Sequence, residues 1–141
     1  MTDIEIATSA LQDHTLALCK NGEVITSDLR GVAPMVGFIS SGKKLDGYSA
    51  ADKVVGKAAA MLFIKAGVTA VHAVTLSQSG QRLFEKHGIK YSFESLTEHI
   101  INRSQTGLCP MEQTVSETDD IDTGVKLIMK KLEEMLLDTR C

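Results

Sequence analysis

The chain of 141 residues has no tryptophan, only four phenylalanines and two tyrosines, and only two prolines. Proteins that bind single-stranded nucleic acids stack bases on aromatic side chains, so this chain offers little for that role. The formal net charge of −3 also gives no basic surface for DNA or RNA. We therefore expect an aliphatic core and no nucleic-acid partner.

Long apolar runs and paired cysteines are also lacking. No stretch approaches the roughly 18 apolar residues of a membrane span, so no membrane partner is expected. Residues 1–5 show no basic region followed by an apolar one. Cys19, Cys109 and Cys141 are an odd number without paired spacing, which indicates free thiols in a reducing compartment. The expected location is the cytoplasm.

The composition that is present, 43% hydrophobic and 23% charged, is that of an ordinary globular protein. The length suits one domain, and no repeat or linker divides it, so residues 1–141 are expected to form a single domain. The four histidines lack metal-ligand spacing and cysteine partners. Neither a metal nor another cofactor is expected.

Local patterns predict the elements of the N-terminal half. Thr2-x-x-Glu5 is a capping box that predicts a helix over 3–13, and Asn21-Gly22 suits the tight turn of a hairpin. A second capping box, Ser49-x-x-Asp52, predicts a helix over 51–66 that is apolar on every side from 58 to 64 and therefore buried against the sheet. The other elements expected here are strands over 15–19 and 23–26 and a helix over 31–39.

The second half alternates strands and helices. The sequence predicts a buried strand over 68–76, a helix over 77–87, a strand over 89–93, a short helix and a loop over 94–108, a helix from Pro110, and an amphipathic helix over 122–137. This order predicts an α/β fold with a single mixed β-sheet layered between helices. The Met- and Leu-rich face of the last helix suggests a homo-oligomer.

The first candidate site is the segment that contains Asp52, Lys53, Gly56 and Lys57. If the segment is helical, the two lysines share a face, Gly56 allows close approach of another backbone or a ligand, and free N–H groups at the helix start suit an anion. Cations at that end oppose the helix dipole unless an anion compensates them. The alternative is that Asp52 only caps the helix and the lysines reach solvent.

The second candidate site contains Asn102, Arg103, Cys109, Pro110 and Glu112. A cysteine that caps a helix near an arginine has its thiolate favoured, as nucleophilic and redox cysteines do. Glu112 could return to the Cys109 amide in a capping box or act as a base. The alternative is a small buried cysteine followed by an ordinary helix start.

These two stretches, 51–60 and 101–112, resemble the signatures of a small family of uncharacterised prokaryotic proteins with a domain of unknown function. The resemblance implies a cytidine deaminase-like fold and no particular activity. Deaminases of that fold carry His-x-Glu or Cys-x-Glu and Pro-Cys-x-x-Cys at two helix starts. The resemblance places Asp52-Lys53 and the Ser77–Gly80 segment there, which lack the zinc ligands. It also implies a pocket between these helix starts, with Lys53, Lys57 and Ser77 as its lining.

Two functions follow from these patterns. In the first, the domain binds a small anionic, including nucleotide-like, molecule through the lysines and helix N–H groups. In the second, it is an enzyme that uses Cys109 as nucleophile or redox centre, with Arg103 holding an anion and Glu112 or Asp52 moving protons.

Overall fold

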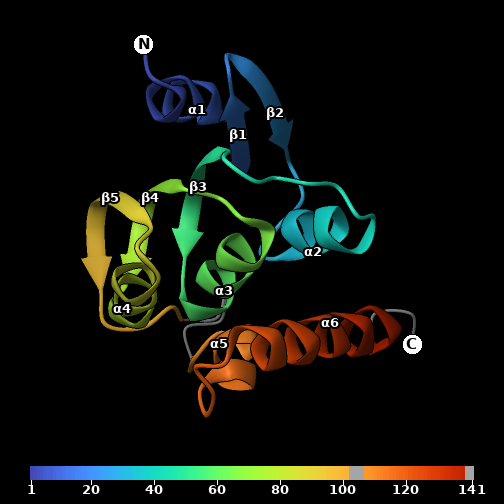
Figure 1. Ribbon diagram of the computed structural model, residues 1–141. Helices are drawn as coiled ribbons and strands as arrows, with labels where there is room; N and C mark the ends of the chain where they lie inside the picture. Colours follow the sequence, from blue (N-terminus) through green and yellow to red (C-terminus); the bar gives the residue numbers. More distant parts are fainter. Residues whose placement is uncertain (102–106, 139–141) are drawn as a thin grey trace.

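The computed structural model, which describes residues 1–101 and 107–138, contains one five-stranded mixed sheet with helices on both faces (Figure 1). The strand order is β2-β1-β3-β4-β5; β1 is antiparallel to both neighbours, while β3, β4 and β5 are parallel. This confirms the predicted α/β class with a single mixed sheet. The strands are β1 (Leu16–Lys20), β2 (Glu23–Ser27), β3 (Ser49–Val55), β4 (Ala70–Ser77) and β5 (Lys90–Thr97).

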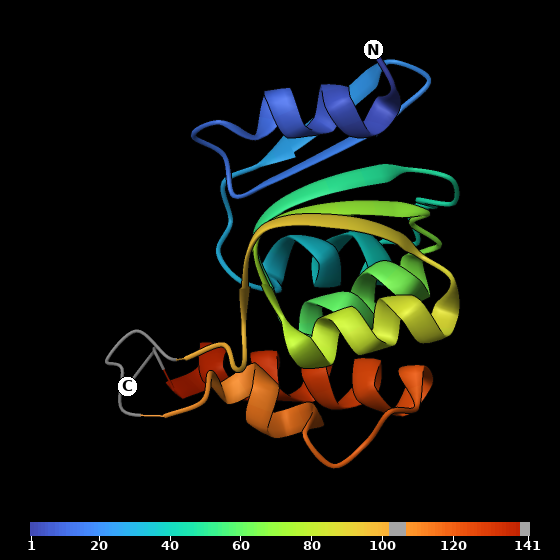
Figure 2. The ribbon, with the colours of Figure 1, turned by 90° about the vertical axis from the view of Figure 1, so that its left-hand side faces the viewer.

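The helices form three groups around this sheet. Helix α1 lies on one face, α2, α3 and α4 lie on the other, and α5 and α6 form a further layer over α3 (Figure 2). None of the helices in the described ranges is long and apolar enough to cross a bilayer. The helices are α1 (Asp3–Leu11), α2 (Ala33–Ser40), α3 (Lys57–Ala66), α4 (Gln78–His87), α5 (Pro110–Val115) and α6 (Ile121–Asp138).

The N-terminal helix and hairpin are as predicted. Thr2 and Glu5 form the capping box of α1, and Asn21 and Gly22 have φ angles of 51° and 80°, as a tight hairpin turn requires. The carboxylate of Asp3 accepts the amides of Asn21 and Gly22 at 2.9 and 3.2 Å. The hairpin turn is therefore tied to the first turn of α1.

Helix α3 is the central helix of the core. Its residues Ala60 to Phe63 are fully buried, and Gly67 ends it in the left-handed conformation with φ 87°. The sheet lies on one side of α3 and α6 on the other, which explains its apolar circumference. The predicted burial of the 58–64 run is confirmed.

The expected start of this helix at residue 51 is wrong. Residues Ser49–Val55 form β3, which is hydrogen-bonded between β1 and β4, and α3 begins only after Gly56. Ser49 and Asp52 therefore form no capping box. The Ala-rich segment has local helical preference, but pairing with two strands from other parts of the chain overrides it. This pairing places β3 at the centre of the sheet.

Two smaller differences concern β5 and α6. Strand β5 continues to Thr97, so the short helix expected within 94–108 is replaced there by strand, and residues 102–106 lie outside the described part. Helix α6 packs its apolar side, including the buried Val125 and Ile128, on its own domain. The surface that suggested an oligomer is thus largely covered within the chain.

Candidate functional site

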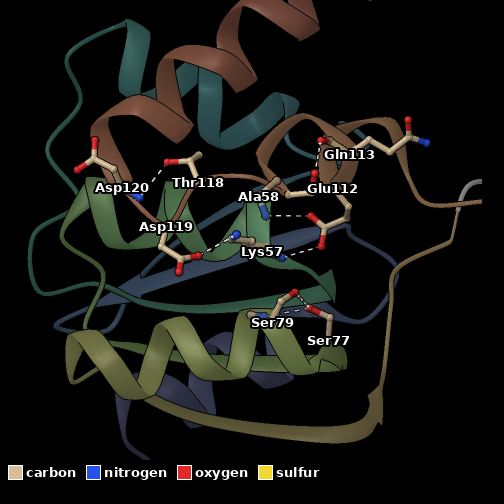
Figure 3. Close-up of polar contacts among 11 residues, drawn as sticks. Lys57, Ala58, Ser77, Ser79, Glu112, Gln113, Thr118, Asp119 and Asp120 are labelled. Atoms are coloured by element: carbon tan, nitrogen blue, oxygen red, sulfur yellow. Dashed lines mark hydrogen bonds and ion pairs between the residues drawn. The ribbon is translucent and has the colours of Figure 1, made fainter.

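The start of α3 is capped by a carboxylate from another helix. The N-cap residue Gly56 has no side chain to offer, and Glu112 of α5 fills the position (Figure 3). Its two oxygens accept the amides of Lys57 and Ala58 at 2.8 and 2.9 Å. Glu112 is only 9% exposed, so these bonds compensate its burial. The free amides at the start of α3 are therefore already bound by a carboxylate of the protein itself.

Gly56 is required for this close approach. A Cβ at residue 56 would lie 2.3 Å from Oε1 of Glu112, and a Cβ at Gly80 would lie 3.2 Å from the carbonyl oxygen of Gly56. The starts of α3 and α4 therefore lie against one another. The group that approaches Gly56 most closely in the structure is the carboxylate of Glu112, where the sequence suggested another backbone or a ligand.

The side chain of Lys57 points away from Glu112 toward a cationic hollow. Its Nζ lies 2.8 Å from Oδ1 of Asp119, and the lysine side chain is 12% exposed while the aspartate is 67% exposed. Figure 3 shows Lys57 between the two carboxylates. The hollow has a volume of about 300 Å³ and is lined by Lys57, Ser79, Arg82, Leu83, Lys86 and Asp119.

The electrostatics of the hollow are visible in Asp119. Its pKa is lowered chiefly by the hydrogen bond from Lys57 and the charge of Lys57, with smaller effects of Lys86 and Arg82. One exposed carboxylate thus experiences three positive side chains. Asp119 occupies this region as an internal anion.

The start of α4 supplies the opposite wall. The Ser77 hydroxyl is fully buried, accepts the Gly80 amide at 3.0 Å and lies 3.1 Å from the Ser79 hydroxyl. Ser77 is therefore occupied as the cap of α4. Its neighbour Ser79, rather than Ser77, borders the hollow.

Asp52 and Lys53 lie elsewhere, because β3 is a strand. Asp52 pairs in register with Leu16 and Ala73, both buried, and burial raises the pKa of its carboxyl to about 7, an effect that the amides of Val54 and Lys53 partly offset. The Lys53 ammonium donates to the carbonyl of Gln12, after α1. The expectation that Lys53 and Lys57 share a helix face is wrong.

Cys109 is the N-cap residue of α5 but forms no side-chain cap bond. Its amide donates to the carbonyl of Ile100 at 3.0 Å, so of the two roles suggested for Glu112 the capping box with Cys109 is not formed. Cys109 lines a different, mainly apolar hollow of about 540 Å³, and Asn102 and Arg103 lie outside the described residues. The other lining residues of this hollow are Arg30, Gly31, Val32, Ile101, Pro110, Met111, Leu132 and Met135.

The structure thus brings together Gly56, Lys57 and Glu112 from the two sequence signatures. Arg82, Lys86 and Asp119 were missed, although the spacing of Arg82 and Lys86 by four residues puts both on one face of α4. In the part of the chain that the structure describes, no three His, Cys, Asp or Glu side chains gather as a metal site would require.

The fold and this site define a five-stranded α/β domain with an internally capped helix start beside a cationic hollow. Residues 7–132 match the family model described as TM1506, domain of unknown function (DUF1893), and the chain therefore belongs to this family. It is similar to the crystal structure of a DUF1893 family protein (TM1506) from Thermotoga maritima, with 25% identity, a TM-score of 0.82, and coverage of 93% of this chain and 92% of that one. Comparison with curated proteins gives no match.

Proposed function

We propose that this domain binds a small anionic molecule in the hollow beside Lys57. The observation that carries the proposal is the gathering of Lys57, Arg82 and Lys86 around one cavity on a chain whose net charge is −3. Among the described residues of the lining, Asp119 is the one acid, and it is two-thirds exposed. A ligand anion can therefore replace its carboxylate without unpacking the core.

The lining indicates the chemistry of the ligand. A guanidinium binds phosphate or carboxylate with two parallel hydrogen bonds, and the two ammonium groups add charge without fixed geometry. About 300 Å³ is at the lower end of small-molecule sites, and the described residues that line the hollow include no aromatic ring for stacking. The favoured ligand is a small phosphorylated or carboxylated compound. A nucleotide-like ligand would place its phosphate here and its base outside.

The position of the hollow supports the same proposal. It lies beside the touching starts of α3 and α4, and the deaminase-like fold that the family resemblance implies has its pocket between two helix starts. The residues at these starts, Lys57-Ala58-Ala59 and Ser77–Gly80, have no imidazole or thiol. Their chemistry suits binding of an anion better than zinc-dependent deamination.

Titration calorimetry with inorganic phosphate, a sugar phosphate and a nucleoside monophosphate tests the proposal. Arg82→Gln should weaken binding of the phosphorylated ligands about tenfold or more, because a hydrogen bond to a charged group contributes roughly 1.5–3 kcal/mol. Tighter binding of the nucleoside monophosphate than of the sugar phosphate would favour the nucleotide-like class.

Lys44→Gln is the matched control, since Lys44 is exposed and does not line the hollow. It removes one positive charge and should leave the affinity nearly unchanged. Equal losses in both variants would show only nonspecific attraction. If none of the three anions gives a heat of binding at millimolar concentration, the proposal is contradicted.

An enzyme that uses Cys109 is the second candidate. The observation that favours it is the position of this half-buried thiol in the wall of the larger hollow, together with Arg30. Neither carboxylate suggested for proton transfer is among the described residues that line this hollow, since Glu112 is bonded to the start of α3 and Asp52 lies in β3. A covalent adduct on Cys109 that forms and decays during turnover would support it.

A further inference from the structure

The outer edge of β5 has the features of a strand that pairs with another chain. Strand β5 is hydrogen-bonded to β4 and ends the described sheet, and six of its eight side chains are exposed. It has eight residues and no proline, whereas β2 at the opposite edge has only five. Long unprotected edges present free N–H and C=O groups, which is why natural proteins cover or interrupt them.

The apolar side chains of β5 point to the same conclusion. A row of stacked rings runs from Phe84 of α4 through Tyr91 to Phe93, with centroid separations of 6.1 and 6.4 Å. Phe93 is 38% exposed at the end of this row, and Leu96 on the same strand is 39% exposed. Half of the six aromatic residues of the chain thus lie in a row that is open at its outer end.

The sequence of β5 is complementary to itself in one antiparallel register. A twofold axis perpendicular to the sheet keeps the side chains of opposite residues on the same face. When Ser92 lies opposite Ser92 of the partner subunit, Lys90 lies opposite Glu94 of the partner subunit. The twofold symmetry forms this pair of opposite charges twice. On the other face Tyr91 meets Phe93 of the partner subunit and extends the aromatic row. In the registers that place Tyr91 opposite Tyr91 of the partner subunit, or Phe93 opposite Phe93 of the partner subunit, Lys90 no longer lies opposite Glu94 of the partner subunit.

We propose that β5 pairs with β5 of a second copy of this chain, in the register centred on Ser92, so that one sheet runs through both subunits. Lys90 is exposed. Oε2 of Glu94 lies 3.3 Å from Nε2 of His72, but the Glu94 side chain is 62% exposed and can still contact a lysine of the partner subunit. The charges select the register, and burial of Phe93 supplies the apolar contact.

Sedimentation equilibrium over a concentration series tests this dimer by charge exchange. Lys90→Glu and Glu94→Lys each place like charges opposite one another, and each should weaken dimerisation at least tenfold. The double variant, Lys90→Glu with Glu94→Lys, restores opposite charges and should return the dissociation constant to within about threefold of wild type.

Lys44→Glu and Glu117→Lys are the matched controls, because both residues are exposed, lie outside β5 and change the net charge by the same amounts. They should leave the dimer unchanged. A wild-type chain that remains monomeric to millimolar concentration would overturn the proposal. A dimer that is insensitive to the single variants, or that the double variant fails to restore, would show a different interface and also overturn it.

Discussion

Two carboxylates contact Lys57, and they differ in almost every respect. Glu112 binds the main-chain amide of Lys57, is 9% exposed, and comes from a helix packed on α3. Asp119 binds the side-chain ammonium, is 67% exposed, and lies between α5 and α6. The first contact replaces a missing N-cap side chain, and the second neutralises a charge in an open hollow.

This difference separates a structural anion from a replaceable one. Removal of Glu112 would leave the buried amide of Ala58 and the half-buried amide of Lys57 without acceptors, which is costly. Removal of Asp119 would leave a lysine that can still reach water or a ligand, and exposed ion pairs contribute little to stability. A positive helix start is therefore insufficient evidence for a ligand site, because the protein can supply the anion itself.

The largest effect is expected for Glu112→Ala, which should lower the free energy of unfolding by about 3 kcal/mol through loss of two charge-assisted bonds. Gly56→Ala should also destabilise, because the new Cβ would meet the carboxylate at 2.3 Å. In the double variant the clash is absent, so Gly56→Ala should cost less than half as much there. Urea unfolding of the four proteins measures this coupling.

Gly37→Ala is the control for that cycle, since nothing lies within 4 Å of a Cβ at this position of α2. Alanine there should leave stability unchanged or raise it by up to about 1 kcal/mol. Strictly additive costs of Gly56→Ala and Glu112→Ala would show that the two residues are not coupled and would contradict the described contact.

Asp52 is a third carboxylate that sharpens the comparison. It is half-buried in β3, and within the described part of the chain no cationic side chain contributes to the shift of its pKa. The folded-state pKa of about 7 exceeds the unfolded value of 3.8, so the folded protein binds the proton more tightly. Stability should therefore fall as the pH rises from about 4 to 7. Asp52→Asn should remove this loss and stabilise the protein by roughly 2 kcal/mol at pH 8, with little effect below pH 4.

Thermal and urea unfolding of the Asp52→Asn protein between pH 4 and 8 measure the difference. Asp13→Asn, at an exposed position, is the control and should show no such pH-dependent gain. A stabilisation by Asp52→Asn that is the same at every pH would mean that ionisation of this carboxyl is not its cause.

The smallest effect is expected for Asp119→Asn. It removes the internal competitor of the cationic hollow, so phosphate affinity should rise about three- to tenfold while the free energy of unfolding changes by less than about 1 kcal/mol. Phosphate titrations of this variant and of Glu117→Gln, a nearby exposed control, make the comparison. Weaker phosphate binding by Asp119→Asn would show that Asp119 helps to form the site rather than occupying it.

Local signals in the sequence account for much of the fold. The turn at Asn21-Gly22, the capping box of α1 and the glycines that end α3 and α4 act over a few residues, and the apolar run 58–64 needs no partner to be recognised. Strand β3 could not be predicted in this way. In sequence this segment looks like the beginning of the helix that continues as α3. Only its pairing with β1 and β4 decides that it forms a strand.

The candidate site was predictable only in part, for the same reason. Gly56, Lys57 and Glu112 stand out in the sequence, but the bond between Glu112 and the Lys57 amide joins residues 55 positions apart. Arg82 and Lys86 were not identified as site residues, because no local pattern in the sequence shows that Lys57 lies beside them. Only the packing of α3 against α4 combines these charges.

The separate packing of α1 has a consequence for hydrogen exchange. The fully buried residues between α1 and the sheet have small side chains apart from Leu11, namely Ala7, Leu11, Ala17, Cys19 and Ala51, and the larger Ile6 and Val74 are only partly buried there. Helix α3 is instead enclosed on both sides by larger buried side chains. Detaching α1 exposes less apolar area than detaching α3, so it should open in partial unfolding events while the rest of the protein stays folded. The amide protons of α1 then exchange with solvent through these openings, and those of α3 only when the whole domain unfolds.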